Sequence, residues 1–243
     1  MNICVTGASS GIGCELVKQL IKDGHSVWGI ARRGNLLEEL KKELGTDSSF
    51  LYSVCDVSVE SEVIRVAHEM EEKAFSVDAI ILAAGVFSND ISDGLDYGLF
   101  KEMMGVNLYG SLNFVNIFLP KFLKQGFGQF VALSSTTALK PSLRGIGYPA
   151  GKAALGMAFR GLDLAYRPRN IIFSTIYLGP VTTDMWNAKR SFAVADKKQI
   201  ASTIKRVLKT KKSVYYIPFW PTLISRISLL PDRWYIRLTE LFR

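Results

Sequence analysis

Side chains that could hold a metal or cross-link the chain are scarce in this sequence of 243 residues. It has three cysteines (Cys4, Cys14 and Cys55) and two histidines, which leaves little for a disulfide framework or a metal site. We therefore expect reduced, buried thiols and no metal. Long apolar runs are missing too: the longest, residues 79–87, has nine residues, against roughly 18 in a membrane span.

A leader sequence is also not recognisable. A strand pattern begins at Asn2 with no charged region before it, so we expect no signal peptide and a cytoplasmic location. Hydrophobic residues make up 48% of the chain, which excludes disorder as its main state. The net charge is +8, and residues 186–243 hold 13 of the Lys and Arg residues against 3 acidic ones. No nucleic-acid-binding signature accompanies this charge, so no nucleic-acid partner is expected.

Apolar segments alternate with segments of helical periodicity along the chain. The pattern predicts strands at residues 2–6, 26–31, 50–55, 77–83, 129–134, 171–177 and 213–217, and helices at 11–23, 35–44, 58–73, 97–104, 106–124, 146–166 and 197–208. Strands separated by helices predict right-handed crossovers and one doubly wound, parallel α/β sheet of about seven strands with helices on both faces. No linker interrupts the pattern, so residues 1–217 form one domain and 218–243 extend it. Ligands of such sheets lie beyond the carboxyl ends of the strands.

A glycine-rich turn follows the first predicted strand and leads into a helix. Its sequence from Thr6 to Gly13 is TGASSGIG. Glycines allow close approach of the backbone, and the amides at a helix start favour a pyrophosphate. The predicted phosphate-binding residues are Gly7, Ser9, Ser10, Gly11, Ile12 and Gly13. The alternative is a tight turn whose glycines serve packing only.

The ends of the next three strands also carry candidate cofactor contacts. Arg32 and Arg33 follow the second strand. At this position an acidic residue would bind a ribose hydroxyl of NAD, whereas a guanidinium suits the 2′-phosphate of NADP, so the pattern favours NADP. The alternative is a solvated basic turn. Asp56, followed by Val57, either accepts a hydrogen bond from an adenine amino group or caps the helix near Ser58. The small residues after the fourth strand either let a cofactor lie against the sheet edge or allow close packing: these are Ala83, Ala84 and Gly85.

A possible proton-transfer group follows the fifth strand. Ser135 ends that strand, and Tyr148 and Lys152 lie four residues apart, on one face of a predicted helix. A nearby ammonium favours the phenolate and lowers the pKa of the tyrosine, which makes it usable as a general acid or base. A tyrosine and a lysine at this spacing also occur by chance on solvated surfaces. Beyond the sixth strand, Gly179 begins a turn whose backbone can bind a carboxamide.

Together these segments resemble the single-domain branch of the short-chain dehydrogenase/reductase family over residues 2–217. The motifs are TGASSGIG, ARR, DV, LAAG, the VN pair ending at Asn107, the serine, YPAGK and GPVTT, all in order. The resemblance implies a Rossmann-type fold and a nicotinamide-dependent oxidoreductase acting on a ketone or secondary alcohol. It implies that Ser135 polarises the carbonyl, Tyr148 passes the proton, Lys152 holds the ribose, and Asn107 supports a proton relay. It also implies that Val181 and Thr183 contact the carboxamide.

With the two arginines, the resemblance implies NADPH-dependent reduction of a ketone or aldehyde. An NADP-sensing regulator without turnover is the main rival, but a sensor has no chemical need for the serine, tyrosine and lysine together. An epimerase or dehydratase of the longer branch is less favoured, because the chain lacks a sizeable C-terminal substrate domain. Two positions depart from the family pattern: Leu82 replaces an asparagine, and Pro180 stands one place later than usual.

The C-terminal part gives two further expectations. Residues 182–200 are expected to form a lid whose Met185, Trp186 and Phe192 favour an apolar substrate. Residues 219–243 have apolar stripes with aromatics beside basic residues, which suits either an anionic membrane surface or packing within the oligomer. The resemblance also implies a homodimer or homotetramer formed through the helices at 106–124 and 146–166.

Overall fold

The computed structural model describes residues 1–142, 145–179, 181 and 196–217. They form one seven-stranded parallel sheet in the order β3-β2-β1-β4-β5-β6-β7. The strands are β1 (Asn2–Thr6), β2 (Ser26–Ala31), β3 (Phe50–Val54), β4 (Ala79–Leu82), β5 (Gly128–Ser135), β6 (Ile171–Leu178) and β7 (Val214–Ile217). The predicted doubly wound α/β fold is confirmed.

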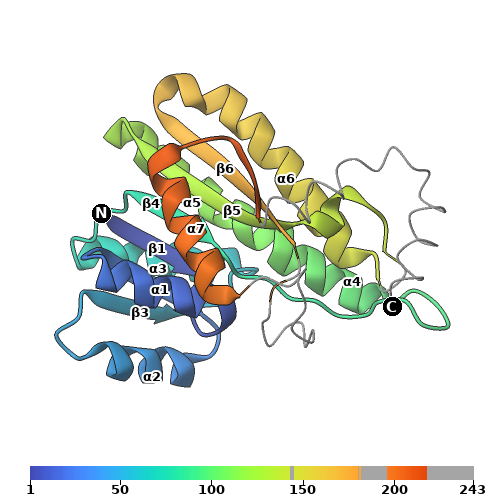
Figure 1. Ribbon diagram of the computed structural model, residues 1–243, viewed down its shortest axis with the longest axis horizontal. Helices are drawn as coiled ribbons and strands as arrows, with labels where there is room; N and C mark the ends of the chain where they lie inside the picture. The colour runs from blue at the N-terminus through green and yellow to red at the C-terminus, as the bar shows by residue number, and fades with distance from the viewer. Residues whose placement is uncertain (143–144, 180, 182–195, 218–243) are drawn as a thin grey trace.

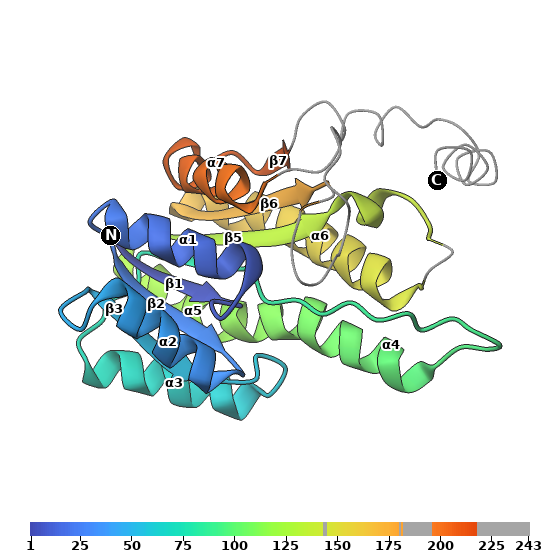
Figure 2. The ribbon, with the colours of Figure 1, turned by 60° about the horizontal axis from the view of Figure 1, so that its bottom comes forward.

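Helices cover both faces of this sheet (Figures 1 and 2). They are α1 (Gly11–Lys22), α2 (Gly34–Leu44), α3 (Glu60–Glu72), α4 (Tyr97–Met104), α5 (Gly110–Gln125), α6 (Gly147–Tyr166) and α7 (Lys197–Thr210). One apolar core joins α1, α2 and α7 to one face, and a second joins α3, α5 and α6 to the other. No helix within the described ranges has both the length and the apolar character needed to cross a membrane.

Two elements differ from the sequence-based expectation. The strands β5, β6 and β7 follow one another across the sheet in one direction, and α6 and α7 connect them. The helix α6 packs on one face of the sheet, whereas α7 packs on the opposite face, with α1. This last crossover is therefore left-handed, whereas right-handed crossovers were predicted throughout. The 20-residue helix α6 already packs against β5 and β6 on the other face. In addition, α4 and α5 are joined without a break by a π-helical turn, Gly105–Tyr109.

The strand order reverses between β1 and β4, so the loops after these neighbouring strands diverge at the centre of the sheet. Such a divergence leaves a crevice beyond the carboxyl ends of the strands, where ligands of this architecture bind. Leu82, the residue at the asparagine position of the family pattern, is buried at the end of β4 and pairs in register with Thr6. The substitution is accommodated in the apolar core, and the predicted position of the site is unaffected.

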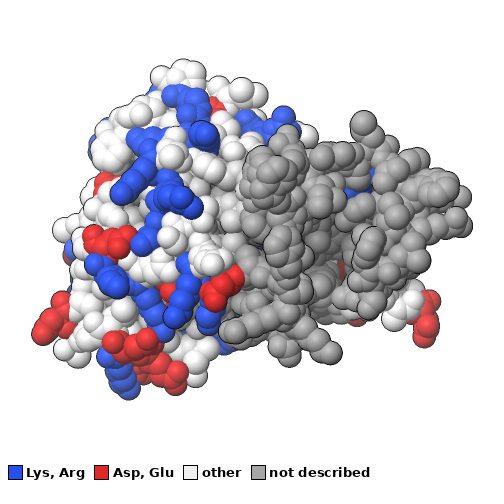
Figure 3. Space-filling model, in the orientation of Figure 1, with Lys and Arg blue, Asp and Glu red and all other residues white. Residues whose placement is uncertain are grey.

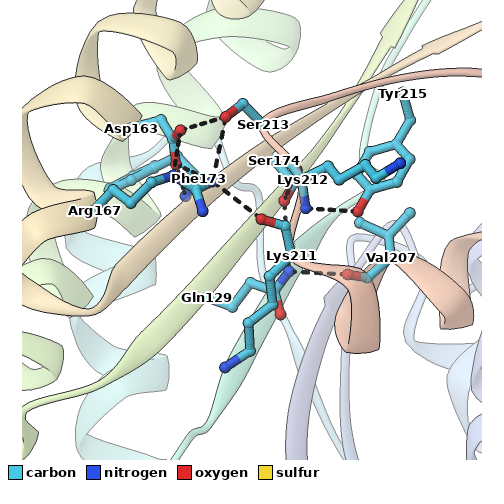
Figure 4. A network of polar contacts seen from close by, with 10 residues as sticks. All are labelled: Gln129, Asp163, Arg167, Phe173, Ser174, Val207, Lys211, Lys212, Ser213 and Tyr215. Carbon is cyan, nitrogen blue, oxygen red and sulfur yellow. Dashed lines mark hydrogen bonds and ion pairs between the residues drawn. The ribbon is translucent and has the colours of Figure 1, made fainter.

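A buried carboxylate fixes the C-terminal end of α6, as Figure 4 shows. Asp163 accepts hydrogen bonds from the Arg167 guanidinium (both at 2.9 Å), from the Ser213 hydroxyl (2.5 Å) and from the Phe173 amide (3.0 Å). These partners lie at the end of α6, before β7 and on β6. Because a buried carboxylate needs such partners, this network attaches α6 firmly to the sheet far from the crevice.

Candidate active site

A cavity of about 690 Å³ lies beyond the carboxyl ends of the strands. Its walls come from the loops after β1 to β6 and from the start of α6. It is lined by these predicted site residues: Gly7, Ser9, Ser10, Gly11, Ile12, Gly13, Arg32, Arg33, Asp56, Val57, Ala83, Ala84, Gly85, Ser135, Tyr148, Lys152, Gly179 and Val181. Residues predicted separately from six different loops thus lie around one cavity. Asn107 does not line it, and Thr183 lies outside the described residues.

The turn between β1 and α1 has the geometry expected of a phosphate site. Gly7 and Gly11 have φ angles of +69° and +57°, in the left-handed region that favours glycine. A Cβ atom on Gly13 would lie 2.2 Å from the Gly7 carbonyl oxygen, so the backbone passes itself too closely for any side chain. The first residues of α1, Gly11 to Gly13, line the cavity, so the positive end of the helix dipole lies there and fits a pyrophosphate group.

Both arginines lie at the outer part of the cavity. The Arg33 guanidinium donates hydrogen bonds to the hydroxyls of Ser9 (3.0 Å) and Ser10 (2.5 Å), which ties the loop after β2 to the glycine-rich turn. Arg32 lies 3.6 Å from the Asp56 carboxylate, and its side chain is 53% exposed. Two cations therefore stand where the ribose of a bound dinucleotide is expected.

Asp56 stabilises a turn and does not cap a helix. Its carboxylate accepts hydrogen bonds from the Ser58 amide (2.9 Å) and hydroxyl (2.6 Å). Burial alone would raise the pKa of Asp56, but the hydrogen bonds from Ser58 and the Arg32 charge together lower it. The alternative that this residue caps the following helix is wrong, because α3 begins at Glu60 with Val59 as its N-cap.

The proton-transfer group is assembled where β5 meets α6. Tyr148 lies in the first turn of α6, half-buried at the cavity wall, and its hydroxyl is hydrogen-bonded to Ser135. Lys152, one turn further, is 5% exposed, and its Nζ donates to the Leu133 carbonyl oxygen at 2.9 Å. The Ser134 hydroxyl donates to the Lys152 carbonyl oxygen at 2.9 Å, which holds α6 against β5.

The pKa values at this end of the cavity differ from the sequence-based expectation. Burial raises the pKa of Tyr148, and the hydrogen bond with Ser135 offsets this only in part. Burial also lowers the pKa of Lys152 to about 8. The expected lowering of the tyrosine pKa by the lysine is therefore not found: desolvation of the phenol is the largest influence on its pKa, and Lys152 Nζ lies 5.8 Å from the centre of the Tyr148 ring. Near neutral pH, the Tyr148 phenol therefore keeps its proton.

Asn107 has a bracing position behind the cavity. It is fully buried in the π-helical turn, accepts a hydrogen bond from the Val86 amide (3.2 Å) and donates to the Val86 carbonyl oxygen (2.8 Å). A Cβ on Gly85 would lie 2.8 Å from Asn107 Oδ1 and 3.4 Å from Lys152 Nζ. Asn107 therefore holds the segment after β4 next to Lys152; its predicted relay role stays a prediction.

Sequence reasoning missed two residues of the segment between β4 and α4. Phe87 lines the cavity and packs edge-to-face on Tyr148, with ring centroids 5.5 Å apart. Its position just after the predicted LAAG motif was the available signal. Asp90 is fully buried and contacts the start of α6. No sequence pattern connects Asp90 with a helix that begins 57 residues later.

A glycine-rich turn, a tyrosine hydrogen-bonded to a serine, and a buried lysine around one crevice define a dinucleotide-binding oxidoreductase of Rossmann-type fold. The family model described as short chain dehydrogenase matches residues 1–193. The chain belongs to the short-chain dehydrogenase/reductase family.

Individual relatives agree with this assignment. An uncharacterized oxidoreductase of Staphylococcus saprophyticus is 29% identical over 81% of this chain and 86% of its own length. A benzil reductase ((S)-benzoin forming) of Saccharomyces cerevisiae is 31% identical over 63% of this chain and 61% of its own length. Among solved structures, an alcohol dehydrogenase of the archaeon Thermococcus sibiricus, complexed with 5-hydroxy-NADP, has a TM-score of 0.78 and 26% identity, covering 89% of this chain and 95% of that one.

Proposed function

We propose that this protein reduces a ketone or aldehyde to an alcohol with NADPH. One observation carries the proposal: the proton-donating group of Ser135, Tyr148 and Lys152 and the two cations Arg32 and Arg33 line the same cavity. The glycine-rich turn would hold the pyrophosphate of a dinucleotide laid along that cavity, and the arginines would hold its 2′-phosphate. The tyrosine would then be on the nicotinamide side of the cavity.

The residues at the inner end then act as follows. Ser135 and Tyr148 both offer hydroxyl groups to the substrate oxygen, which orients the carbonyl carbon toward the cofactor. The bound nicotinamide supplies the hydride. Tyr148 donates its proton to the oxygen as negative charge develops there, and its raised pKa keeps the phenol protonated for this step near neutral pH. Lys152 would hold the ribose hydroxyls through its ammonium group, and the small residues Ala83 to Gly85 would leave space for the nicotinamide at the sheet edge.

The choice of NADPH rests on the charge at the outer end. Guanidinium groups bind phosphate in a bidentate manner, and no acidic residue between Trp28 and Leu37 is present to bind the 2′-hydroxyl of NAD. The 5-hydroxy-NADP bound in the Thermococcus sibiricus alcohol dehydrogenase supports the same choice.

The substrate end favours an apolar carbonyl compound. Phe87, Leu178 and Val181 line the cavity, and the relatives include a benzil reductase and an alcohol dehydrogenase. The expected lid comprises residues 182–200 and includes Met185, Trp186 and Phe192. Of these residues, 182–195 lie outside the described part of the chain. We propose that aryl and long-chain ketones are reduced faster than small polar ones.

The direct test is a panel of ketones and aldehydes followed by loss of NADPH absorbance. We expect turnover of at least one apolar ketone with NADPH, and weaker activity with NADH. An NADP-sensing regulator, the rival proposal, binds NADPH but oxidises none with any carbonyl. Binding without turnover across the panel would therefore favour the regulator.

We also propose that the basic C-terminal quarter contacts an anionic membrane surface. Lys and Arg side chains gather in a band over α7 in Figure 3. The residues from Lys197 to Ile217 include no acidic side chain. The sequence that follows, residues 218–243, lies outside the described residues, but it combines arginines with aromatic and aliphatic residues. Polybasic segments gain about 1 kcal/mol per Lys or Arg near an anionic surface.

Vesicle flotation tests this contact. The test variant replaces four exposed cations of α7 by glutamine: Lys197, Lys198, Arg206 and Lys209. The matched control replaces four lysines of other helices or their ends: Lys42, Lys73, Lys121 and Lys124. At low salt, wild type and control should float with phosphatidylglycerol-containing vesicles and not with pure phosphatidylcholine, and the α7 variant should float less. Equal flotation of both variants, or none of the wild type, would contradict the proposal.

Homo-oligomerisation through α5 and α6 is proposed as well. Large apolar side chains are exposed on α6, at Met157 (65%) and Leu164 (81%), and at Tyr109 (57%) in the π-helical turn that leads into α5. Burial of such groups against a second copy removes apolar surface from water. Light scattering after size exclusion should give a dimer or tetramer for the wild type and a smaller species for Leu164→Arg.

A further inference from the structure

The start of α6 carries the proposed proton donor but has no cap of its own. Its N-cap residue, Ile146, makes no side-chain capping bond, and the first turn holds no acidic residue. The first amides of a helix have no partner within the helix and need an acceptor from elsewhere. Here that acceptor is Asp90, from the segment between β4 and α4.

Both oxygens of the Asp90 carboxylate are used at this point. Oδ1 accepts from the Ile146 amide and Oδ2 from the Gly147 amide, each at 2.8 Å. The carboxylate is fully buried, so these two bonds form away from water, where charge-assisted hydrogen bonds are strong. Tyr148 is the next residue along the chain, so the anchored backbone is that of the proton donor.

The two glycines beside this contact have no room for a side chain. A Cβ on Gly145 would lie 2.5 Å from Asp90 Oδ1, and one on Gly147 would lie 3.0 Å from Oδ2. Gly145 also has a φ of +145°, which other residues rarely adopt. The two glycines therefore let the helix start close directly onto the carboxylate.

The anchoring segment is itself held in place. The Asp90 carbonyl oxygen accepts from the Asp96 amide at 2.9 Å, and Asp96 in turn caps α4 through the Leu99 amide at 3.0 Å. Three residues before Asp90, Phe87 packs on the Tyr148 ring. One segment thus contacts the proton donor twice, at its backbone and at its ring.

We infer that Asp90 is a positioning residue for the reduction: it fixes the first turn of α6 and thereby the place of the Tyr148 hydroxyl relative to Ser135. It does not line the cavity and touches neither cofactor nor substrate. The inference rests on the proposed function, since it assigns Asp90 a part in proton transfer by Tyr148. A small displacement of a reacting group can cost about 100-fold in rate.

The test compares Asp90→Asn with Asp96→Asn. The two carboxylates belong to the same segment and both cap a helix, but only Asp90 caps the helix of Tyr148. An amide retains one acceptor, so Asp90→Asn keeps at most one of the two bonds. We expect its kcat to fall at least about tenfold, its NADPH Kd to stay within about twofold, and its solvent deuterium isotope effect on kcat to rise, because proton transfer becomes slower relative to other steps. Asp96→Asn should keep the wild-type kcat and isotope effect.

Amide hydrogen exchange gives a readout that needs no turnover. In Asp90→Asn, exchange should become faster in a peptide spanning residues 145–152; in Asp96→Asn, it should do so only at the start of α4. Should Asp90→Asn not fold, Gly145→Ala disturbs the same carboxylate from the other side and should act in the same direction.

Wild-type kcat in Asp90→Asn, or a loss of NADPH binding that matches the loss of kcat, would overturn the inference. So would an equal loss of kcat in Asp96→Asn. Failure of the proposed function gives a different result: no turnover by the wild type with any carbonyl, whatever the exchange pattern at α6.

Discussion

The two ends of the cavity place their ionisable groups in opposite environments. At the inner end, Lys152 is 5% exposed and burial shifts the pKa of both Lys152 and Tyr148. At the outer end, the Arg32 side chain is 53% exposed and Arg33 also faces solvent. Water screens charges at the outer end, whereas the inner end depends on desolvation and fixed hydrogen bonds. Chemistry is therefore expected from the inner end, and cofactor choice from the outer end.

The largest expected effect belongs to the inner end. Tyr148→Phe removes the proton donor but keeps the ring that packs on Phe87. General acid catalysis contributes about 10²- to 10⁴-fold, so kcat should fall by about 10³-fold while NADPH still binds. Steady-state rates with fluorescence titration of NADPH check this, with Tyr109→Phe, outside the cavity, as the control. Retained turnover would show that the proton comes from another group.

At the outer end, replacing Arg32 and Arg33 together by alanine should act on binding alone. Hydrogen bonds to charged groups are worth about 1.5–3 kcal/mol, so the NADPH Kd should rise by about 10- to 100-fold and the NADH Kd should change little. Fluorescence titration of both cofactors measures the two values. Equal changes for NADPH and NADH would remove the assignment of the 2′-phosphate to these arginines.

The pH dependence separates the two ends further. Lys152 has a pKa lowered to about 8, so its ammonium group is present at pH 7 and lost as the pH rises through that value. The pKa of Tyr148 is raised, so the phenol keeps its proton over the same range. We expect kcat/KM for reduction to be flat below pH 7 and about tenfold lower at pH 9. Lys152→Met should be slower at pH 7 and show no step near pH 8; a step that persists in this variant would point to another group.

The smallest expected effect is that of salt. Because the Debye length falls from about 10 Å at 0.1 M to about 3 Å at 1 M, added salt should weaken NADPH binding a few-fold through the exposed arginines. It should leave kcat at saturating cofactor unchanged. Titrations and rates at 0.05 M and 0.5 M sodium chloride compare the two. A salt-sensitive kcat would mean that the inner end is open to solvent.

The strands and most helices could be predicted from the sequence because their apolar periodicity is strong and local. The cavity wall could be predicted too, because each group directly follows a strand and the carboxyl ends of parallel strands converge. Three features could not be predicted. The left-handed crossover to β7 depends on which face α6 already occupies. The raised pKa of Tyr148 depends on burial, which spacing does not reveal, and the Asp90 contact joins segments that share no pattern.

Transfer of deuterium from NADPH labelled at the nicotinamide C4 position tests the central claim most directly. With a ketone from the panel, separate incubations with the two C4-labelled forms should show which face is transferred. The account predicts that one of them gives an alcohol with one deuterium on the former carbonyl carbon by mass spectrometry, and that Tyr148→Phe abolishes this product. No labelled alcohol with any carbonyl compound, or equal label transfer by Tyr148→Phe, would contradict it.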